Sequence, residues 1–376
     1  MDRLQIQSAI STDKDDANGY SMKSPENPTT VSTCTITQTD SPPHVWHNNR
    51  KIMIYDCFTF FNELDLLEIR LNTLNDVVDR FVLVEATRTH SNQPKPLVFA
   101  RNSDRFKPFL HKITHIVVDD YPEFETAWSY ENHQRNCINR GLENCDDNDR
   151  IMISDADEIP DPLKVLEHKD DSGIMVFQQL PYYYYINHYH LQLATWPGTK
   201  MVSYRDFQHG LDHVENYGLY LPKKLNQGTT ATKIRIYKDA VPIPDGGWHF
   251  TYLGGLERVR EKIQAFSHEE YNLPEFTDLR SIEKRIRGAF TSHRLIGVEI
   301  DETYPAYLRN NKERYAHLIG PVTPPEIAER VRKRAWLTKK INRFKRLAAQ
   351  FLTNLIPVKT WRKSARTYLI VKLTLP

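Results

Sequence analysis

The sequence ISDADEIPDP, residues 153–162, places several carboxylates directly behind an apolar run, RIMIS, that is typical of a buried strand. The carboxylates are those of Asp155, Asp157, Glu158 and Asp161. Side chains this close repel one another unless positive charge lies among them. In an extended or turning segment, Asp155 and Asp157 point to the same side, which suits a hard divalent ion such as Mg²⁺ or Mn²⁺. The alternative is a solvated acidic turn before a helix that starts at Asp161 and Pro162.

Other phosphate and metal motifs do not fit this segment. A calcium-binding EF-hand loop counted from Asp155 needs glycine and glutamate where Pro160 and Leu166 stand. A phosphatase turn of the DxDGT type is excluded because Glu158 and Ile159 follow the second aspartate. No GxxxxGK(S/T) loop occurs, which argues against a P-loop ATPase.

The elements that must position the acidic segment alternate between strands and helices. Strands are predicted at 51–58, 80–86, 113–120 and 150–154, and helices at 62–74 and 126–142. We expect Asn62 to be the N-cap of the first helix and Gly141 to close the second. This alternation predicts a Rossmann-like, mostly parallel, doubly wound sheet. Ligands bind at the carboxyl ends of such strands, where the acidic segment and Glu85 both lie.

After residue 172 the chain becomes rich in aromatic residues. The segments 173–193, 198–207, 229–240 and 244–255 are predicted to be further strands with glycine turns, and helices are predicted from residue 255 onward. Residues 1–49 are rich in Ser, Thr, Asp, Asn and Pro, and we expect them to be a disordered extension.

The C-terminal part of the chain is strongly basic. The formal net charge of the whole chain is +2, yet residues 330–376 contain 14 Lys and Arg and no acidic residue. In INRFKRLAAQFLTNLI (341–356) the apolar residues recur at helical spacing, with Arg343, Lys345 and Arg346 off that stripe. A basic amphipathic helix is typical of contact with an anionic membrane surface or a partner. The alternative is a helix packed on the rest of the chain.

Cysteine usage and hydropathy bear on the compartment. The cysteines, Cys34, Cys57, Cys137 and Cys145, lack a CxxC pairing, which favours free thiols in a reducing compartment. No run of 18 apolar residues occurs, and the N-terminus lacks the apolar core of a signal peptide. We therefore expect a cytoplasmic protein, peripheral at the inner face of a membrane through its basic tail.

Five segments together resemble glycosyltransferase family 17. They are residues 54–97, QRNCINRGL (134–142), ISDADEIP (153–160), WPGTKMV (196–202) and GGWHFTYLGG (246–255), and they span roughly residues 51–315 in the family's order. The resemblance implies a glycosyltransferase A fold with an appended acceptor-side β/α region and C-terminal helices. It implies a metal-dependent, inverting enzyme that moves a sugar, above all GlcNAc from UDP-GlcNAc, onto a glycan or lipid-linked acceptor with β linkage.

The resemblance also suggests which residues bind the metal and the donor. Asp157 is the expected direct ligand of Mn²⁺ or Mg²⁺, and His249 a third ligand, although a lone histidine is as readily structural. Asp155 either reaches the metal through water or holds the ribose. Arg135 and Asn136 are expected to contact base or phosphate, the alternative being a helix surface. Glu85 is expected to meet the nucleoside, the alternative being a strand end in solvent.

An inverting transfer needs a base near the acceptor hydroxyl. The candidates are Asp245, Glu158 and Glu257, and we prefer Asp245 because it precedes an aromatic, glycine-containing turn. Expected acceptor-binding residues are Trp196, Tyr184 and Trp248. For Tyr184 and Trp248 the alternative is packing in the core.

The predicted organisation is an extension at 1–49, a catalytic domain at 50–320 and a basic tail at 321–376. Expected partners are a nucleotide sugar, a glycan or lipid-linked acceptor and an anionic membrane surface, but not nucleic acid, because no recognition module accompanies the basic tail. Two other functions stay open from the sequence alone. One is a metal-dependent phosphoester or nucleotide hydrolase using the same carboxylates, and the other is a non-catalytic carbohydrate-binding protein at a membrane surface.

Overall fold

The structure is a computed structural model, and it describes residues 50–209, 230–291 and 294–354. Its described strands form one sheet in the order β11-β7-β6-β8-β4-β1-β2-β3, with β5, β9 and β10 paired beside this path. The predicted extension at 1–49 lies outside the described residues.

The centre of the sheet is a parallel group of strands. It consists of β1 (Ile54–Phe60), β2 (Arg80–Ala86), β3 (Ile113–Val118) and β4 (Arg150–Asp155). β2 and then β3 lie on one side of β1, whereas β4 lies on its other side, and all these pairs are parallel. The strand order therefore reverses between β1 and β4, which is where doubly wound sheets bind ligands.

Alternate residues of the central strands pack against helices on opposite faces of the sheet. On one face, Phe58 of β1 lies in a core with Leu67 and Leu71 of α1 (Leu64–Leu74). The short helices α2 (Val98–Arg101) and η1 (Ser103–Phe109) join this face through Phe99 and Phe106. The side chains alternate because successive residues of a strand point to opposite faces.

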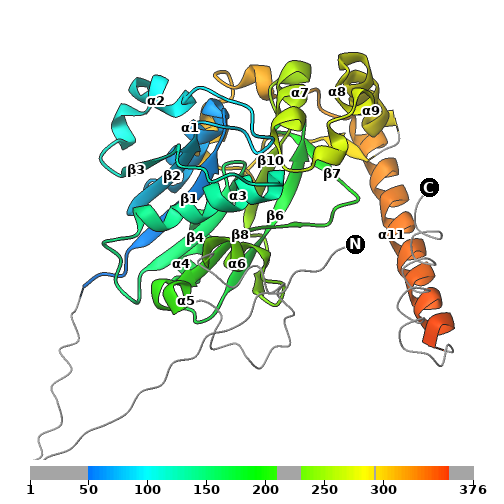
Figure 1. The fold of residues 1–376 in the computed structure, drawn as a ribbon. Helices are drawn as coiled ribbons and strands as arrows, with labels where there is room; N and C mark the ends of the chain where they lie inside the picture. Colours follow the sequence, from blue (N-terminus) through cyan, green and yellow to red (C-terminus); the bar gives the residue numbers. More distant parts are fainter. Residues whose placement is uncertain (1–49, 210–229, 292–293, 355–376) are drawn as a thin grey trace, which may run out of the picture. The chain divides into compact units, whose positions relative to one another are not determined.

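On the other face, Cys57 of β1 lies in a core with Ile138 of η2 (Cys137–Gly141) and Ile234 of α6 (Thr230–Ile236). The helix α3 (Ala127–Asn136) precedes η2 and crosses the viewer's side of the sheet in Figure 1. The predicted α/β class and Rossmann-like parallel core are thus confirmed.

The rest of the sheet is mixed and forms the appended region. Its strands are β5 (Glu158–Pro160), β6 (Met175–Tyr183), β7 (His188–His190), β8 (Trp196–Ser203), β9 (Val241–Ile243), β10 (Gly247–Thr251) and β11 (Leu295–Gly297). β8 joins the two parts, because it pairs antiparallel with both β4 and β6. An aromatic core that includes Tyr182, Trp248, Phe250 and Tyr315 fills this region.

Three local predictions were wrong. The strand predicted at 229–240 does not form in its described part, because α6 occupies Thr230–Ile236. The β-branched residues favour a strand, but Ala231 and Ile234, one helical turn apart, are both fully buried in the core. The strand predicted at 198–207 ends at Ser203, and α5 (Tyr204–His209) follows. The residue before α1 is Glu63, not Asn62, and Glu63 accepts hydrogen bonds from the N–H groups of Phe61 and Asn62.

Helices predominate after residue 254, as predicted. They are α7 (Gly255–Ala265), η5 (Glu269–Tyr271), α8 (Pro274–Thr277), α9 (Leu279–Thr291), α10 (Ala306–Asn310), η6 (Ala316–Leu318) and α11 (Pro325–Asn354), and α4 (Pro162–Glu167) lies earlier in the chain. α11 packs through Val331 and Ala335 against Leu191 and Ile296. Most side chains of the predicted stripe at 341–356 lie outside the described ones.

Two further predictions concern the cysteines and membrane crossing. Cys57, Cys137 and Cys145 are thiols that form no disulfide among the described residues, as predicted, and Cys34 lies outside those residues. Among the described helices, none has the length and apolar character needed to cross a membrane.

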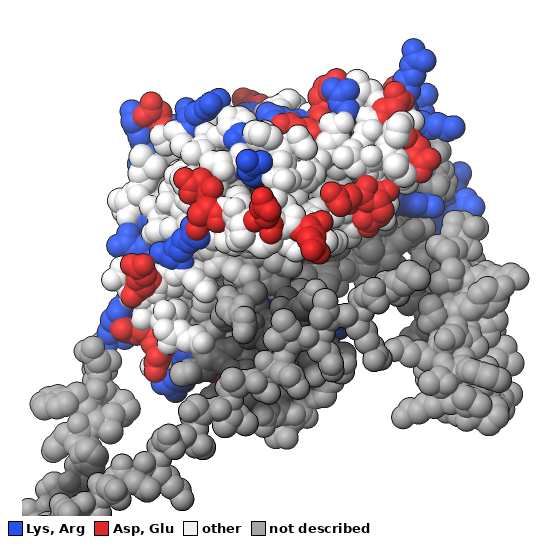
Figure 2. Space-filling view, in the orientation of Figure 1, with Lys and Arg blue, Asp and Glu red and all other residues white. Residues whose placement is uncertain are grey.

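Figure 2 shows basic side chains beside acidic ones along the upper edge of the face it draws.

Candidate active site

A cavity of about 310 Å³ lies where the strand order reverses. It is lined by the carboxyl end of β1, the turn after β4, and parts of α3, β8, β10 and α7. Polar residues in its lining include Thr59, Arg135, Asp155, Asp157, His249 and Lys262. The cavity therefore has the position expected of a ligand site in this class of sheet.

The turn that carries the acidic residues is held from beneath by Arg70 of α1. Its guanidinium group forms a two-pronged ion pair with Asp56, with N–O distances of 2.7 and 2.6 Å. It also donates to Ser154 Oγ at 2.5 Å and to the carbonyl oxygens of Asp155, Ala156 and Glu158 at 3.3, 3.4 and 2.7 Å. Arg70 thus fixes the backbone from which the acidic side chains project.

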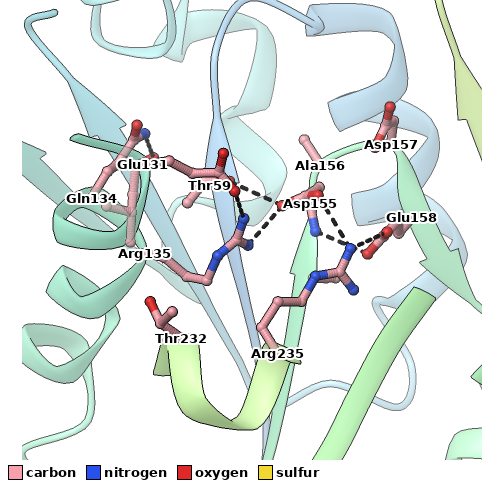
Figure 3. Close-up of polar contacts among 12 residues, drawn as sticks. Thr59, Glu131, Gln134, Arg135, Asp155, Ala156, Asp157, Glu158, Thr232 and Arg235 are labelled. Atoms are coloured by element: carbon pink, nitrogen blue, oxygen red, sulfur yellow. Dashed lines mark hydrogen bonds and ion pairs between the residues drawn. The ribbon is translucent and has the colours of Figure 1, made fainter. Parts of the chain in front are cut away.

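Asp155 is bound by two arginines that come from opposite sides (Figure 3). Arg135 of α3 donates to it at 2.7 Å, and Arg235 of α6 at 3.3 Å. Arg135 is itself oriented by Glu131, 2.6 Å away. Burial raises the pKa of the Asp155 carboxyl, but the two arginines lower it more, so that the pKa lies below its usual range. Asp155 is therefore a carboxylate at neutral pH.

Asp157 points away from the two arginines in Figure 3 and has other cationic neighbours. Lys262 of α7 lies 2.6 Å from its Oδ2, and the His249 Nε2 lies 3.7 Å from the same oxygen. Burial raises the pKa of Asp157, and Lys262 and His249 more than reverse this, so that the pKa is far below its usual range. The two aspartates thus have separate counter-charges, which differs from the single shared ion that the spacing suggested.

The surroundings of Asp157 fit a divalent metal ion. Its buried carboxylate lies beside His249, whose Nδ1 is buried without a hydrogen-bond partner among the described residues. The indole of Trp196 stacks on this imidazole, with ring centroids 4.5 Å apart. A carboxylate oxygen and an imidazole nitrogen are suitable ligands for Mn²⁺.

A different group of side chains also brings possible metal-ligand atoms together. The ligand atoms of Asp120, His133 and Cys137 lie within 4.8 Å of one another. Asp120 also forms an ion pair with Arg140 at 2.7 Å. None of these residues lines the cavity, so this group is separate from the predicted metal site.

Glu158 is not placed to act as a base, contrary to one prediction. Its side chain is buried and does not line the cavity. It accepts from the Trp196 Nε1 at 2.6 Å, from Arg235, and from the backbone N–H of Asp155 at 3.2 Å. By accepting these hydrogen bonds, Glu158 stabilises the conformation of the acidic turn.

Glu85 does not face the cavity either, because α2 begins over the end of β2. Its carboxylate accepts from the backbone N–H groups of Phe99 and Ala100, at 2.9 and 3.4 Å. His115 lies 3.1 Å away, and Lys95 3.7 Å away. Unpaired N–H groups at a helix start need such an acceptor, so Glu85 stabilises α2 rather than meeting a nucleoside.

Asn136 and Asp245 also lie outside the cavity lining. Asn136 Oδ1 accepts from the backbone N–H of Thr232, so it anchors α6. Asp245 is exposed on the turn before β10, whereas Thr251 at the other end of β10 lines the cavity. The base role predicted for Asp245 therefore does not agree with its position.

Among the predicted acceptor-binding residues, only Trp196 lines the cavity. Trp248 is buried in the core, and its Nε1 donates to the carbonyl oxygen of Thr303 at 2.9 Å. Tyr184 lines a separate hollow with Arg285. Glu257 is exposed on α7 and paired with Arg260.

Sequence reasoning missed the cations that neutralise the acidic turn. Arg235 and Lys262 follow Asp155 and Asp157 by 80 and 105 residues, and both come from helices. The signal in the sequence that could have pointed to Lys262 is its place on α7, next to the buried Ile263 and near the buried Val259. The polar Arg70 within a helix of otherwise mostly buried apolar residues is a clearer signal, because such a residue needs a buried partner.

The chain is similar to known glycosyltransferases in sequence. The family model for glycosyltransferase family 17 matches residues 28–221, slightly more than half of the chain. Human beta-1,4-mannosyl-glycoprotein 4-beta-N-acetylglucosaminyltransferase is 33% identical over 107 residues, which cover 26% of this chain and 20% of the human protein. The rat enzyme of the same name gives the same values. The aligned part thus spans a fifth of each relative's length.

Solved structures resemble the chain more distantly. Mannosyltransferase PcManGT from Pyrobaculum calidifontis, in complex with GDP-Man and Mn²⁺, is 15% identical with a TM-score of 0.32, and 86% of each chain is covered. HddC from Yersinia pseudotuberculosis is 11% identical with a TM-score of 0.28, covering 54% of this chain and 90% of that one. Similarity at this level carries no argument about the site. Because the family model matches more than half of its sequence, the chain belongs to glycosyltransferase family 17.

Proposed function

We propose that this glycosyltransferase is metal-dependent and inverting, and that it moves GlcNAc from UDP-GlcNAc onto a glycan or lipid-linked acceptor. One observation carries the proposal: Asp155, Asp157, His249 and the cations Arg135 and Lys262 line a single cavity at the point where the strand order reverses. The name of the human relative supports GlcNAc as the sugar. Mn²⁺ or Mg²⁺ is the proposed metal, held by Asp157 and His249.

The cavity suits a donor whose leaving group is a diphosphate. Transfer of the sugar leaves two phosphates with growing negative charge, and positive groups held in a cavity stabilise that charge. Arg135 lines the cavity while fixed by Asp155 and Glu131, and Lys262 lines it from α7. When bound, the metal would supply further neutralisation of the leaving diphosphate.

We propose Glu63 as the base that accepts the proton of the acceptor hydroxyl. A second cavity, of about 280 Å³, adjoins the first, and the two share Glu63, Tyr252 and Lys262 in their linings. The Glu63 Oε2 accepts from the N–H groups of Phe61 and Asn62 at 3.1 and 3.0 Å, which fixes the carboxylate at this boundary. A donor in the first cavity and an acceptor in the second would meet at Glu63.

Calorimetric titration of the full chain with UDP-GlcNAc, UDP-Gal, UDP-Glc and GDP-Man, each with and without Mn²⁺, tests the donor. We expect UDP-GlcNAc to bind most tightly and only with metal. The rival hydrolase would release UDP at the same rate with and without glycan acceptors, whereas the transferase needs an acceptor for its full rate. Absence of binding by every nucleotide sugar would contradict the proposal.

We also propose that α11 contacts an anionic membrane surface. Trp336 and Leu337 are 58% and 52% exposed, and the Lys340 ammonium lies 4.0 Å from the Trp336 ring centre. An exposed aromatic residue beside basic ones suits the surface of an anionic bilayer. Co-sedimentation with phosphatidylserine vesicles should fall in Trp336→Ser, and equal binding to neutral vesicles would contradict this.

A further inference from the structure

Lys262 occupies an unusual position between the two cavities. It comes from the last turns of α7, and its Nζ donates to Asp157 Oδ2 at 2.6 Å and to Thr251 Oγ1 at 3.2 Å. The Tyr252 ring centre lies 5.6 Å from the same nitrogen. Lys262 lines both cavities, and its side chain is 28% exposed.

Asp157 depends on Lys262 for its counter-charge. The Asp157 side chain is only 7% exposed, and a buried carboxylate is costly without a cation. Arg135 and Arg235 are both engaged by Asp155. His249, 3.7 Å from Asp157, carries a full charge only when protonated. Lys262 is thus the permanent cation that the described structure places at Asp157.

This ion pair conflicts with metal binding at the same carboxylate. A divalent ion bound to Asp157 would repel an ammonium group 2.6 Å from the same oxygen. Lysine has a long, flexible stem and a compact charge, so it leaves one partner for another without moving its helix. The neighbouring space that Lys262 lines is the one proposed for the donor diphosphate.

We propose that Lys262 is an exchangeable counter-ion, which holds Asp157 in the free enzyme, releases it to the metal and then binds the donor diphosphate. The inference rests on the proposed function. It makes Lys262 a competitor of the metal before the donor arrives and a ligand of the donor afterwards. These two roles give a substitution at Lys262 opposite effects on metal affinity and donor affinity.

The test measures Mn²⁺ and UDP affinity separately in Lys262→Met. Without nucleotide, we expect Mn²⁺ to bind about tenfold more tightly than to the wild type, because its competitor is gone. With saturating Mn²⁺, we expect UDP to bind about tenfold more weakly, because a charged hydrogen bond to phosphate is lost. A purely structural lysine would not move the two affinities in opposite directions, and unchanged or weaker Mn²⁺ binding would overturn the inference.

Two further variants serve as controls for this test. Arg260→Met removes a cation from the same helix that is paired with Glu257 and lines neither cavity, so both affinities should stay at wild-type values. Lys262→Arg keeps the charge if Lys262→Met does not fold, and its Mn²⁺ affinity should not tighten; tenfold tighter binding there would overturn the inference. If the wild type binds Mn²⁺ but no UDP-sugar, the proposed function fails on its own, whatever Lys262→Met does to Mn²⁺.

Discussion

Arg70 and Asp56 form an ion pair in which both side chains are completely buried, directly beneath the acidic turn of the candidate active site. The pair links α1 to β1, and the same guanidinium group holds three carbonyl oxygens of the turn. One buried contact thus connects the stability of the fold to the geometry of Asp155 and Asp157.

Loss of Arg70 should therefore be strongly destabilising. Arg70→Met leaves the Asp56 carboxylate buried without a cation, and breaking such a pair costs about 3–5 kcal/mol. Urea unfolding measures this, with Lys51→Met as the control, because Lys51 forms an exposed pair with Asp79 that is worth less than about 1 kcal/mol. A loss of similar size in both variants would contradict the role given to Arg70. Adding Asp56→Leu to Arg70→Met should restore part of the loss.

Asp157 should carry the response to metal. A ligand at about 100 times its Kd adds roughly 2.7 kcal/mol to the folded state, so Mn²⁺ with UDP-GlcNAc should raise the melting temperature of the wild type. We expect Asp157→Asn to lose this increase, because the amide is a neutral and weaker ligand. Asp245→Asn, on an exposed turn outside the cavity, is the matched control and should keep it. If Asp157→Asn keeps the increase in melting temperature and Asp245→Asn loses it, the metal site lies elsewhere.

Glu63 should matter for turnover more than for donor binding. A positioned general base contributes about 10²–10⁴-fold to the rate, so Glu63→Gln should lower kcat by that factor. The amide is nearly the same size and keeps an oxygen for the N–H groups of Phe61 and Asn62, so the Kd for the donor should change little. Glu257→Gln, exposed on α7, is the control. If Glu63→Gln turns over at the wild-type rate, another group is the base.

The sequence predicted the part of the site that depends on strand ends. The alternation of strands and helices places Asp155 at the carboxyl edge of β4, and Arg135, Trp196 and His249 line the same cavity. Their place at this cavity agrees with the sheet topology and the family motifs, and the roles given to them stay predictions. Glu85 satisfies the same strand-end rule, yet α2 covers it, because its carboxylate binds the first N–H groups of that helix.

The contacts that the sequence did not predict depend on how the helices pack. Arg235 reaches Asp155 because α6 is a helix that lies beside α3 and buries Ala231 and Ile234 in the core, whereas its β-branched composition indicated a strand. Lys262 reaches Asp157 only once α7 lies beside β10. Neither contact has a local signature, because each joins segments 80 or more residues apart through tertiary packing.

His188 should make the fold sensitive to acid. Its imidazole is buried on β7, where Nε2 lies 3.2 Å from the carbonyl oxygen of Pro321 and Nδ1 has no partner in the part of the chain that the structure describes. Burial lowers its pKa from 6.5 to about 4. Between these values the unfolded chain binds a proton that the folded chain does not, so stability is full above pH 6.5 and falls as the pH drops toward 4.

The loss due to His188 should be at most about 3 kcal/mol across this window, at about 1.4 kcal/mol per pH unit. Carboxylates also lose stability in acid, so the informative quantity is the difference between the wild type and His188→Gln in urea unfolding at pH 7 and pH 4. Glutamine does not titrate, and the advantage of the wild type over this variant should therefore shrink as the pH falls. His111→Gln, at an exposed position, should keep a constant difference from the wild type. A constant difference for His188→Gln as well would mean that the His188 imidazole binds a proton equally well in the folded and the unfolded chain, and it would contradict the prediction.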